Sequence, residues 1–215
     1  LLRPIIAYGR GKVAADAVFM RAHYERGYPV TIIKPSTTYG PALGLQRQVA
    51  WMDFSWLDRI RKGLPVVVCG EGNALHQFLH VDDAALCFTS VLGRNRCIGQ
   101  TYNMVSRGFT TWAEYHRVAM RIIGREVELV GIPYRDLEAM EIPGFEICRD
   151  IYAHHVFYSA EKLHRDLPEF APKIGLEEGM RRVLAELDRE GKIPPCPRNG
   201  WEDRAIAAQR RVREQ

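Results

Sequence analysis

Residues 30–41 read VTIIKPSTTYGP. The β-branched run Val30–Lys34, which a proline stops, predicts a short buried strand. The residues after it, Ser36–Gly44, are rich in turn formers and predict a loop. Before the strand, Gly11–Arg26 are rich in alanine, carry apolar residues at helical spacing and predict a helix. A helix, a buried strand and a loop in this order begin an alternating α/β pattern.

The same alternation continues along the chain. Helices are predicted over Gln48–Arg61, Ala84–Leu92, Thr110–Ile123, Ser159–Leu167, Leu176–Glu190 and Glu202–Glu214, and strands over Pro65–Cys69, Gln77–Val81, Thr101–Val105 and Glu126–Ile132. Asp82 and Asp83 stand where an N-cap is expected, while Pro133–Asp150 predict mostly loop. Strands that alternate with helices favour an α/β fold with crossover connections.

The composition is that of a globular domain. The 215 residues are 47% hydrophobic and 26% charged. The longest apolar runs, such as Leu64–Cys69, are far shorter than the ~18–20 residues of a membrane span. A net charge of +4 permits a phosphate-bearing ligand without requiring nucleic acid. The five cysteines include no C-x-x-C pair, which disfavours a zinc ribbon and fits reduced thiols in a cytoplasmic protein.

The segment Tyr8-Gly9-Arg10-Gly11-Lys12 places a phenol and an ammonium one helical turn apart. An ammonium close to the hydroxyl lowers the pKa of a tyrosine from its usual ~10 and makes it a usable acid or base near neutral pH. A Y-x-x-x-K pattern is common by chance, and a plain surface pair on a helix is the alternative.

Three motifs follow one another in order. They are Tyr8-x-x-x-Lys12, then Lys34-Pro35 with Thr38-Tyr39-Gly40-Pro41, then Gly70-Glu71-Gly72 with Phe78-Leu79-His80-Val81-Asp82-Asp83. In this order the chain resembles the extended short-chain dehydrogenase/reductase family, in its NAD-dependent epimerase/dehydratase branch. The resemblance runs to about Glu190 and implies a Rossmann-like parallel sheet with a small α/β substrate domain.

The resemblance also implies the site residues and the reaction. Tyr8 would be the catalytic acid or base and would also contact the cofactor, and Lys12 would bind the nicotinamide ribose and lower the pKa of Tyr8. Pro35, Ser36 and Thr37 would lie beside the nicotinamide of NAD or NADP. Hydride would pass to or from the nicotinamide while Tyr8 moves the hydroxyl proton of a sugar-like or hydroxylated small molecule. Substrate contacts are expected from Thr37, Thr38, His76 and Gln77.

The same resemblance divides the chain. Residues 1–40, with parts of 76–105, would complete the dinucleotide-binding domain, and residues 41–75 and 106–192 would form the substrate-binding region. Residues 193–215 would be a linker and a polar helix. The G-x-x-G-x-x-G phosphate loop and the acidic residue that reads the ribose are absent from the sequence, which does not begin with Met. We therefore expect a chain without the first βαβ half of the sheet.

Two residues depart from the family's pattern. Where the family has Arg-Asp, this chain has His76 and Gln77. An arginine binds a diphosphate through two parallel hydrogen bonds, which histidine cannot reproduce. This departure puts a nucleotide sugar in question as the substrate. His76 would then contact an anionic or hydroxylated ligand, or serve only as a polar residue at the start of a strand.

Metal, nucleic acid and a second copy of the chain are the other partners to consider. His76 and His80 share one face of a strand, but a zinc site needs a third close ligand, so no metal is expected. The arginines beside Trp201 predict a solvated helix rather than a nucleic-acid site. Because the chloroplast RNA-binding relatives of this fold bind RNA, a catalytically inactive protein that binds RNA or a protein partner is the alternative function. By analogy with relatives we expect a homodimer and no membrane association.

Overall fold

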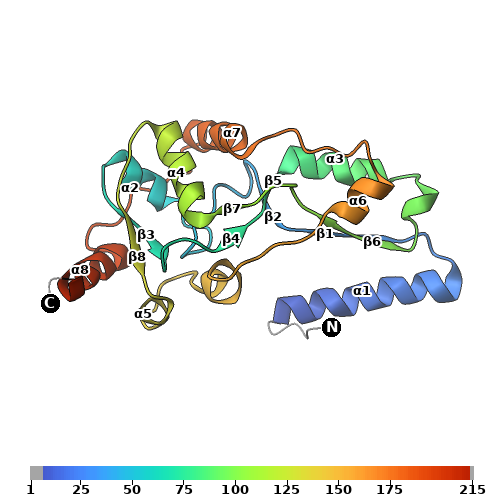
Figure 1. The fold of residues 1–215 in the computed structure, drawn as a ribbon, viewed down its shortest axis with the longest axis horizontal. Coiled ribbons are helices and arrows are strands. Elements are labelled where there is room, and N and C mark those ends of the chain that lie inside the picture. Colours follow the sequence, from blue (N-terminus) through green and yellow to red (C-terminus); the bar gives the residue numbers. More distant parts are fainter. Residues whose placement is uncertain (1–6, 214–215) are drawn as a thin grey trace.

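The computed structural model describes residues 7–213, which alternate between helices and strands (Figure 1). Three strand pairs are parallel and one is antiparallel. The predicted α/β fold is therefore confirmed. Leu1 and Leu2, where the sequence begins, and Glu214, the predicted end of the last helix, lie outside the described residues.

One layer is built on the strand predicted at Val30–Lys34. Strand β1 (Thr31–Pro35) pairs in parallel with β6 (Gln100–Met104). Helices α3 (Val81–Val91) and α6 (Glu161–Asp166) lie on one side of this pair, and α1 (Ala7–Arg26) lies on the other (Figure 1). The side chains between the strands and the first two helices form one buried cluster, which comprises Leu79, Ala84, Cys87, Val91, Cys97, Tyr102, Met104, Leu163, Leu167 and Phe170.

A second layer lies at the other end of the molecule. Strand β3 (Val66–Cys69) is buried at every residue and pairs in parallel with β8 (Leu129–Ile132). An unbroken apolar run of this kind is typical of a parallel strand that is covered on both faces. Helix α5 (Tyr134–Glu138) and helix α8 (Trp201–Arg213) contribute to the cluster on one of these faces.

Two short strand pairs join the layers. Strand β2 (Thr37–Tyr39) pairs in parallel with β5 (Phe78–His80), and β4 (Leu75–His76) pairs antiparallel with β7 (Thr110–Thr111). The largest buried cluster lies beside them. It draws on helices α2 (Ser55–Arg61), α4 (Trp112–Ile123) and α7 (Leu176–Arg189). Strand β2 falls within the predicted loop Ser36–Gly44, where the sequence showed only turn formers.

The predicted helix Gln48–Arg61 is wrong over its first half, because only Ser55–Arg61 are helical. Gln48 is buried, and its amide accepts from the backbone N–H of Cys69 at 3.0 Å and donates to the carbonyl of Tyr152 at 3.2 Å. Partners so far away in the sequence hold residues 48–53 in turns and bends.

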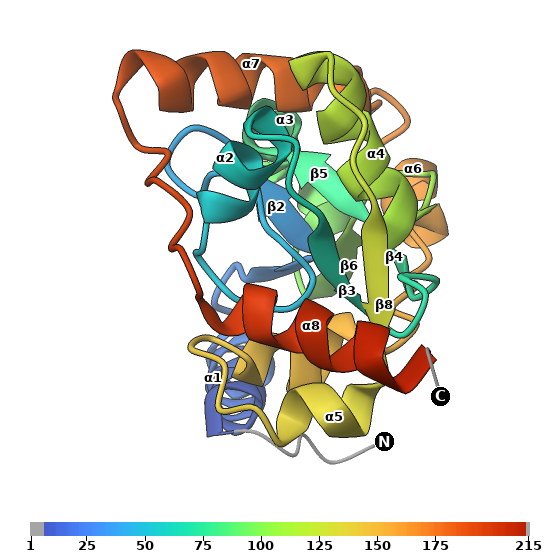
Figure 2. The ribbon, with the colours of Figure 1, turned by 90° about the vertical axis from the view of Figure 1, so that its left-hand side faces the viewer.

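The C-terminal helix is also not the solvated element that the sequence predicted. Figure 2 shows α8 crossing β3 and β8. Glu202, Ala205 and Ile206 on α8 are buried. One carboxylate oxygen of Glu202 accepts from Arg47 and from the backbone N–H of Val67, each at 2.8 Å. The hydrogen bond to Val67 anchors the helix to β3, and the ion pair anchors it to Arg47.

The cap of α3 differs from the expected Asp82 or Asp83. His80 is the N-cap, and its Nδ1 accepts from the backbone N–H of Asp82 at 3.2 Å. Asp83 is buried and instead accepts the backbone N–H groups of Lys173 and Ile174 at 3.0 and 2.9 Å. Asp83 therefore fixes the loop that precedes α7. Within residues 7–213, every helix is too short or too polar to span a lipid bilayer.

Candidate active site

The predicted catalytic pair lies on α1. Lys12 Nζ is 5.4 Å from the centre of the Tyr8 ring, within the range of a cation–π contact. The Tyr8 side chain is 71% exposed, and Lys12 is exposed as well. The helix therefore brings the two groups together at a surface that a ligand can reach.

Helix α1 is tied to the strand that follows it. Asp16 forms an ion pair of 2.7 Å with Lys34, the residue before Pro35 on β1. At its other end, His23 Nδ1 is bonded to the carbonyl of Tyr28 at 2.9 Å. These contacts fix the helix that carries Tyr8 relative to the strand that leads into Ser36 and Thr37.

Ser36 lies at the carboxyl end of β1. Its N–H donates to the carbonyl of Met104 at 3.2 Å, which continues the β1–β6 ladder. Its buried Oγ has no hydrogen-bond partner among the residues that the structure describes. A buried hydroxyl without a partner costs roughly 1–3 kcal/mol, and such atoms often mark the position of a ligand or water. The position of Ser36 beside a bound nicotinamide remains a prediction.

Thr37 Oγ1 is hydrogen-bonded to His76 Nε2 at 2.5 Å. The His76 ring is buried, with Phe78, Trp112 and Tyr152 at centroid distances of 5.1, 5.2 and 5.1 Å. Burial lowers the pKa of His76 to about 4. At neutral pH His76 is therefore uncharged and cannot replace an arginine as a diphosphate ligand.

Tyr152, which no sequence motif indicated, completes this cluster. Burial raises the pKa of Tyr152 to about 12, and a hydrogen bond with Thr37 acts in the opposite direction. When Thr37 donates to His76 Nε2, the imidazole proton resides on Nδ1, which is buried and unpartnered within residues 7–213. Tyr152 is the last residue of a π-helix, η2 (Cys148–Tyr152). This helix begins inside the segment Pro133–Asp150, which the sequence predicted to be mostly loop.

The other two predicted substrate contacts lie close by. Thr38 is opposite Leu79 in the β2–β5 pair and is half-buried. Gln77 is buried, donates to the carbonyl of Ser106 at 3.0 Å and accepts from the N–H of Tyr158 at 2.8 Å. Both ends of the Gln77 amide thus bind the protein itself, and its contact with a substrate remains a prediction.

The histidines have separate roles. His154 Nε2 bonds to the carbonyl of Arg149 at 3.0 Å, and His155 Nδ1 accepts from the N–H of Leu75 at 3.1 Å. His80 caps α3. Across the described part of the chain, no group of three or more His, Cys, Asp or Glu residues could hold a metal ion.

Known proteins match much of this chain. Residues 1–104 match the NAD dependent epimerase/dehydratase family. The 2'-dehydrokanamycin reductase of Streptomyces kanamyceticus is 26% identical over 190 residues, which are 88% of this chain and 53% of that protein. The chloroplast stem-loop binding protein of 41 kDa b of Arabidopsis thaliana is 26% identical over 172 residues, which are 80% of this chain and 42% of that protein.

A solved structure extends the comparison to the fold. The crystal structure of UDP-glucose 4-epimerase from Thermotoga maritima with UDP-glucose has a TM-score of 0.68 and 20% identity, over 87% of this chain and 55% of that one.

The parallel strand pairs with helices on both sides define a Rossmann-like α/β protein. Residues 1–104, just under half of the chain, are similar to the NAD dependent epimerase/dehydratase family, and most of the chain shares the fold of the Thermotoga maritima structure. The chain spans about half the length of the curated relatives it matches.

Proposed function

We propose that the whole protein is an NAD- or NADP-dependent epimerase, dehydratase or reductase that acts on a sugar-like or hydroxylated small molecule. The observation that carries this proposal is the Tyr8–Lys12 pair, exposed on a helix that is tied to the strand ending at Ser36. The reductase and the UDP-glucose epimerase among its relatives support the class of reaction and of substrate.

Each residue has a definite task in this reaction. The Tyr8 phenolate oxygen takes the proton of a substrate alcohol as its carbon is oxidised, and the resulting hydroxyl returns that proton in the reverse direction. The Lys12 ammonium stabilises the phenolate form and binds the ribose hydroxyls. When bound, NAD or NADP accepts or supplies the hydride. Ser36 Oγ offers a hydrogen bond to the nicotinamide, and Thr37 contacts the substrate hydroxyls.

The substrate would meet a neutral surface at His76. Because the His76 ring is uncharged, its unpartnered Nδ1 is suited to a substrate hydroxyl, which can donate or accept a hydrogen bond according to the tautomer. The proposal includes the domain division of the sequence argument and a cytoplasmic homodimer. Exposed apolar residues on α1, such as Val18 and Phe19, would support contact with a second copy.

A substrate screen with NAD and NADP, which follows the absorbance of reduced nicotinamide, tests the proposal on the whole protein. Lys12→Met should lower turnover at least ~tenfold, because the phenolate loses its stabilising charge. Arg21→Met removes another exposed cation of α1 and is the matched control. Equal turnover in wild type and Lys12→Met would contradict the role of Lys12.

The second candidate is an inactive protein that binds RNA. The name of the chloroplast stem-loop binding relative supports it. Binding of a stem-loop RNA, measured by fluorescence anisotropy, would then weaken steeply with salt because phosphate contacts release counterions. Absence of binding at low salt excludes this candidate. RNA binding without turnover in the substrate screen would favour it over the enzyme.

A further inference from the structure

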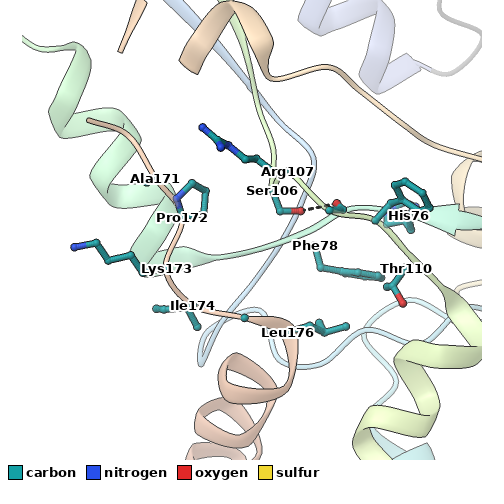
Figure 3. A pocket seen from close by; sticks show the side chains of 13 residues that line it. His76, Phe78, Ser106, Arg107, Thr110, Ala171, Pro172, Lys173, Ile174 and Leu176 are labelled. Atoms are coloured by element: carbon teal, nitrogen blue, oxygen red, sulfur yellow. Dashed lines mark hydrogen bonds between the residues drawn. The ribbon is translucent and has the colours of Figure 1, made fainter. Parts of the chain in front are cut away.

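A pocket of about 440 Å³ lies between two loops that approach from different parts of the chain. Residues 106–110 follow β6, and residues 171–175 lead into α7 (Figure 3). Phe78, Ile174 and Leu176 give the pocket apolar walls, and His76 lines it as well. The pocket shares His76 with the proposed substrate contacts, but the Tyr8–Lys12 pair and the Ser36–Thr37 segment are not among its lining residues.

Two cations flank this pocket. Arg107 and Lys173 belong to the two facing loops, and in Figure 3 both exposed side chains extend outward at the rim, away from His76 and Phe78. Neither forms an ion pair with any residue in the described range. Arg107 Nε reaches only His164 Nε2 at 3.4 Å, and burial lowers the pKa of that histidine, which keeps it neutral. Both positive charges therefore lack a counterion within the described structure.

The amino-terminal end of α7 adds partial positive charge. The helix has 14 residues, its N-cap is Gly175, and no described side chain caps it. The first N–H groups of a helix have no partner within the helix and point out of its amino-terminal end, which here faces the pocket, and they favour an anion there. Glu177 and Glu178 lie in the first turn but are paired with Arg181 and Arg182 at 2.9 and 2.8 Å.

The loop that presents Lys173 is held in place. The buried Asp83 carboxylate accepts the N–H groups of Lys173 and Ile174, which leaves the Lys173 side chain directed outward from a fixed backbone. At the aromatic end, His76 is buried and its Nδ1 is unpartnered within the described residues. The pocket thus combines a cationic end with an aromatic and apolar end.

We propose that this pocket binds an organic anion whose phosphate or carboxylate lies between Arg107 and Lys173 at the start of α7. The ring or hydrocarbon part of the ligand packs against Phe78, Ile174 and Leu176. A cationic rim attracts the charge, and the apolar wall selects an anion that carries a nonpolar group over inorganic phosphate. This binding does not depend on Tyr8.

Calorimetric titration of the full chain with phenyl phosphate tests the proposal. Benzoate distinguishes a carboxylate from a phosphate ligand. Inorganic phosphate carries the anionic group without the ring, and phenol carries the ring without the anionic group. Phenyl phosphate or benzoate should bind more tightly than either half. Arg107→Gln and Lys173→Gln should each weaken binding about tenfold, the usual consequence of losing one charge-assisted hydrogen bond. Arg135→Gln, at an exposed position on α5, is the matched control.

Two further measurements keep the test decisive. If Arg107→Gln unfolds, Lys173→Gln still tests the proposal, because the Lys173 side chain forms no hydrogen bond or ion pair with the described residues that the substitution would remove. Tyr8→Phe should bind the probes as wild type does, so that failure of the enzyme proposal and failure of this one are distinguishable. Absence of probe binding, or equal affinity in wild type and Lys173→Gln, would overturn the proposal.

Discussion

The buried ion pairs beneath α8 make a strong prediction about stability. Glu202 accepts from Arg47 at 2.8 Å and lies 3.4 Å from Arg59 Nε. Arg47 is 0% exposed, and Glu202 also accepts the N–H of Val67. Glu202→Gln keeps the size of the side chain but leaves the two guanidinium groups short of one negative charge.

Removing one partner of a buried pair costs ~3–5 kcal/mol, because the remaining charge stays out of water. Asp53 still contacts Arg47 at 2.8 Å and Asp203 still contacts Arg59 at 2.8 Å, which places the expected loss near the lower end of that range. With a urea dependence of ~2–3 kcal/mol per molar, ~3 kcal/mol lowers the unfolding midpoint by about 1–1.5 M.

Urea unfolding followed by tryptophan fluorescence and circular dichroism measures this loss. Glu128→Gln is the matched control, because Glu128 pairs with Arg210 at 2.8 Å where both side chains are about half exposed. Such a pair contributes ~0–1 kcal/mol. If Glu202→Gln lowered the midpoint no more than Glu128→Gln does, the reasoning about the buried ion pairs would be refuted.

Three further predictions concern the core of the candidate site and its support. Burial lowers the pKa of both His76 and His116 to about 4 in the folded protein, whereas histidines in the unfolded chain have the usual pKa of ~6.5. Below pH ~6.5 the unfolded chain therefore binds more protons than the folded protein. The free energy of unfolding should therefore be highest above pH ~6.5 and should fall between pH ~6.5 and pH ~4. Urea unfolding midpoints measured across that range would show the decrease, and midpoints that do not change with pH would contradict it. Thr37→Val leaves His76 Nε2 unpaired and should cost ~1–3 kcal/mol by urea unfolding, whereas a loss below about 0.5 kcal/mol would contradict the bond. Gly131→Ala would place a Cβ 2.2 Å from the carbonyl oxygen of Gly70, so the melting temperature should drop by several degrees, and an unchanged value would show that the backbone yields.

Hydrophobic periodicity and capping residues predicted those helices and strands that depend on residues within their own segment. The strand predicted at Val30–Lys34 forms at Thr31–Pro35, and the amphipathic helix predicted at Leu176–Glu190 forms at Leu176–Arg189. Thr111 caps its helix through Oγ1, which accepts from the N–H of Glu114 at 3.1 Å. In each case the hydrophobic period or the capping residue lies within the segment itself.

Elements that depend on distant partners could not be predicted in this way. The turns before Ser55 follow from bonds of Gln48 to Cys69 and Tyr152. The burial of α8 follows from Glu202, whose partners Arg47 and Val67 are more than a hundred residues away. A polar helix with one buried carboxylate has the same sequence pattern as a solvated helix.

The candidate site shows the same division. Motif order predicted Tyr8, Lys12 and the Ser36–Thr37 segment as site residues, and in the structure Asp16 and Lys34 join α1 to the strand that precedes that segment. The contact between Thr37 and His76, and the position of Tyr152 beside them, required the folded chain. Thr37, His76 and Tyr152 come from three different short elements, β2, β4 and η2. No spacing in the sequence could therefore have predicted that they meet.

The turnover number of Tyr8→Phe in the whole protein, measured with the substrate found by the screen, tests the central claim most directly. Tyr24→Phe is the matched control, because Tyr24 lies on the same helix and is 76% exposed. Loss of the general acid or base should lower the turnover number by roughly 10²–10⁴. Turnover of Tyr8→Phe equal to that of Tyr24→Phe would show that Tyr8 does not transfer the proton.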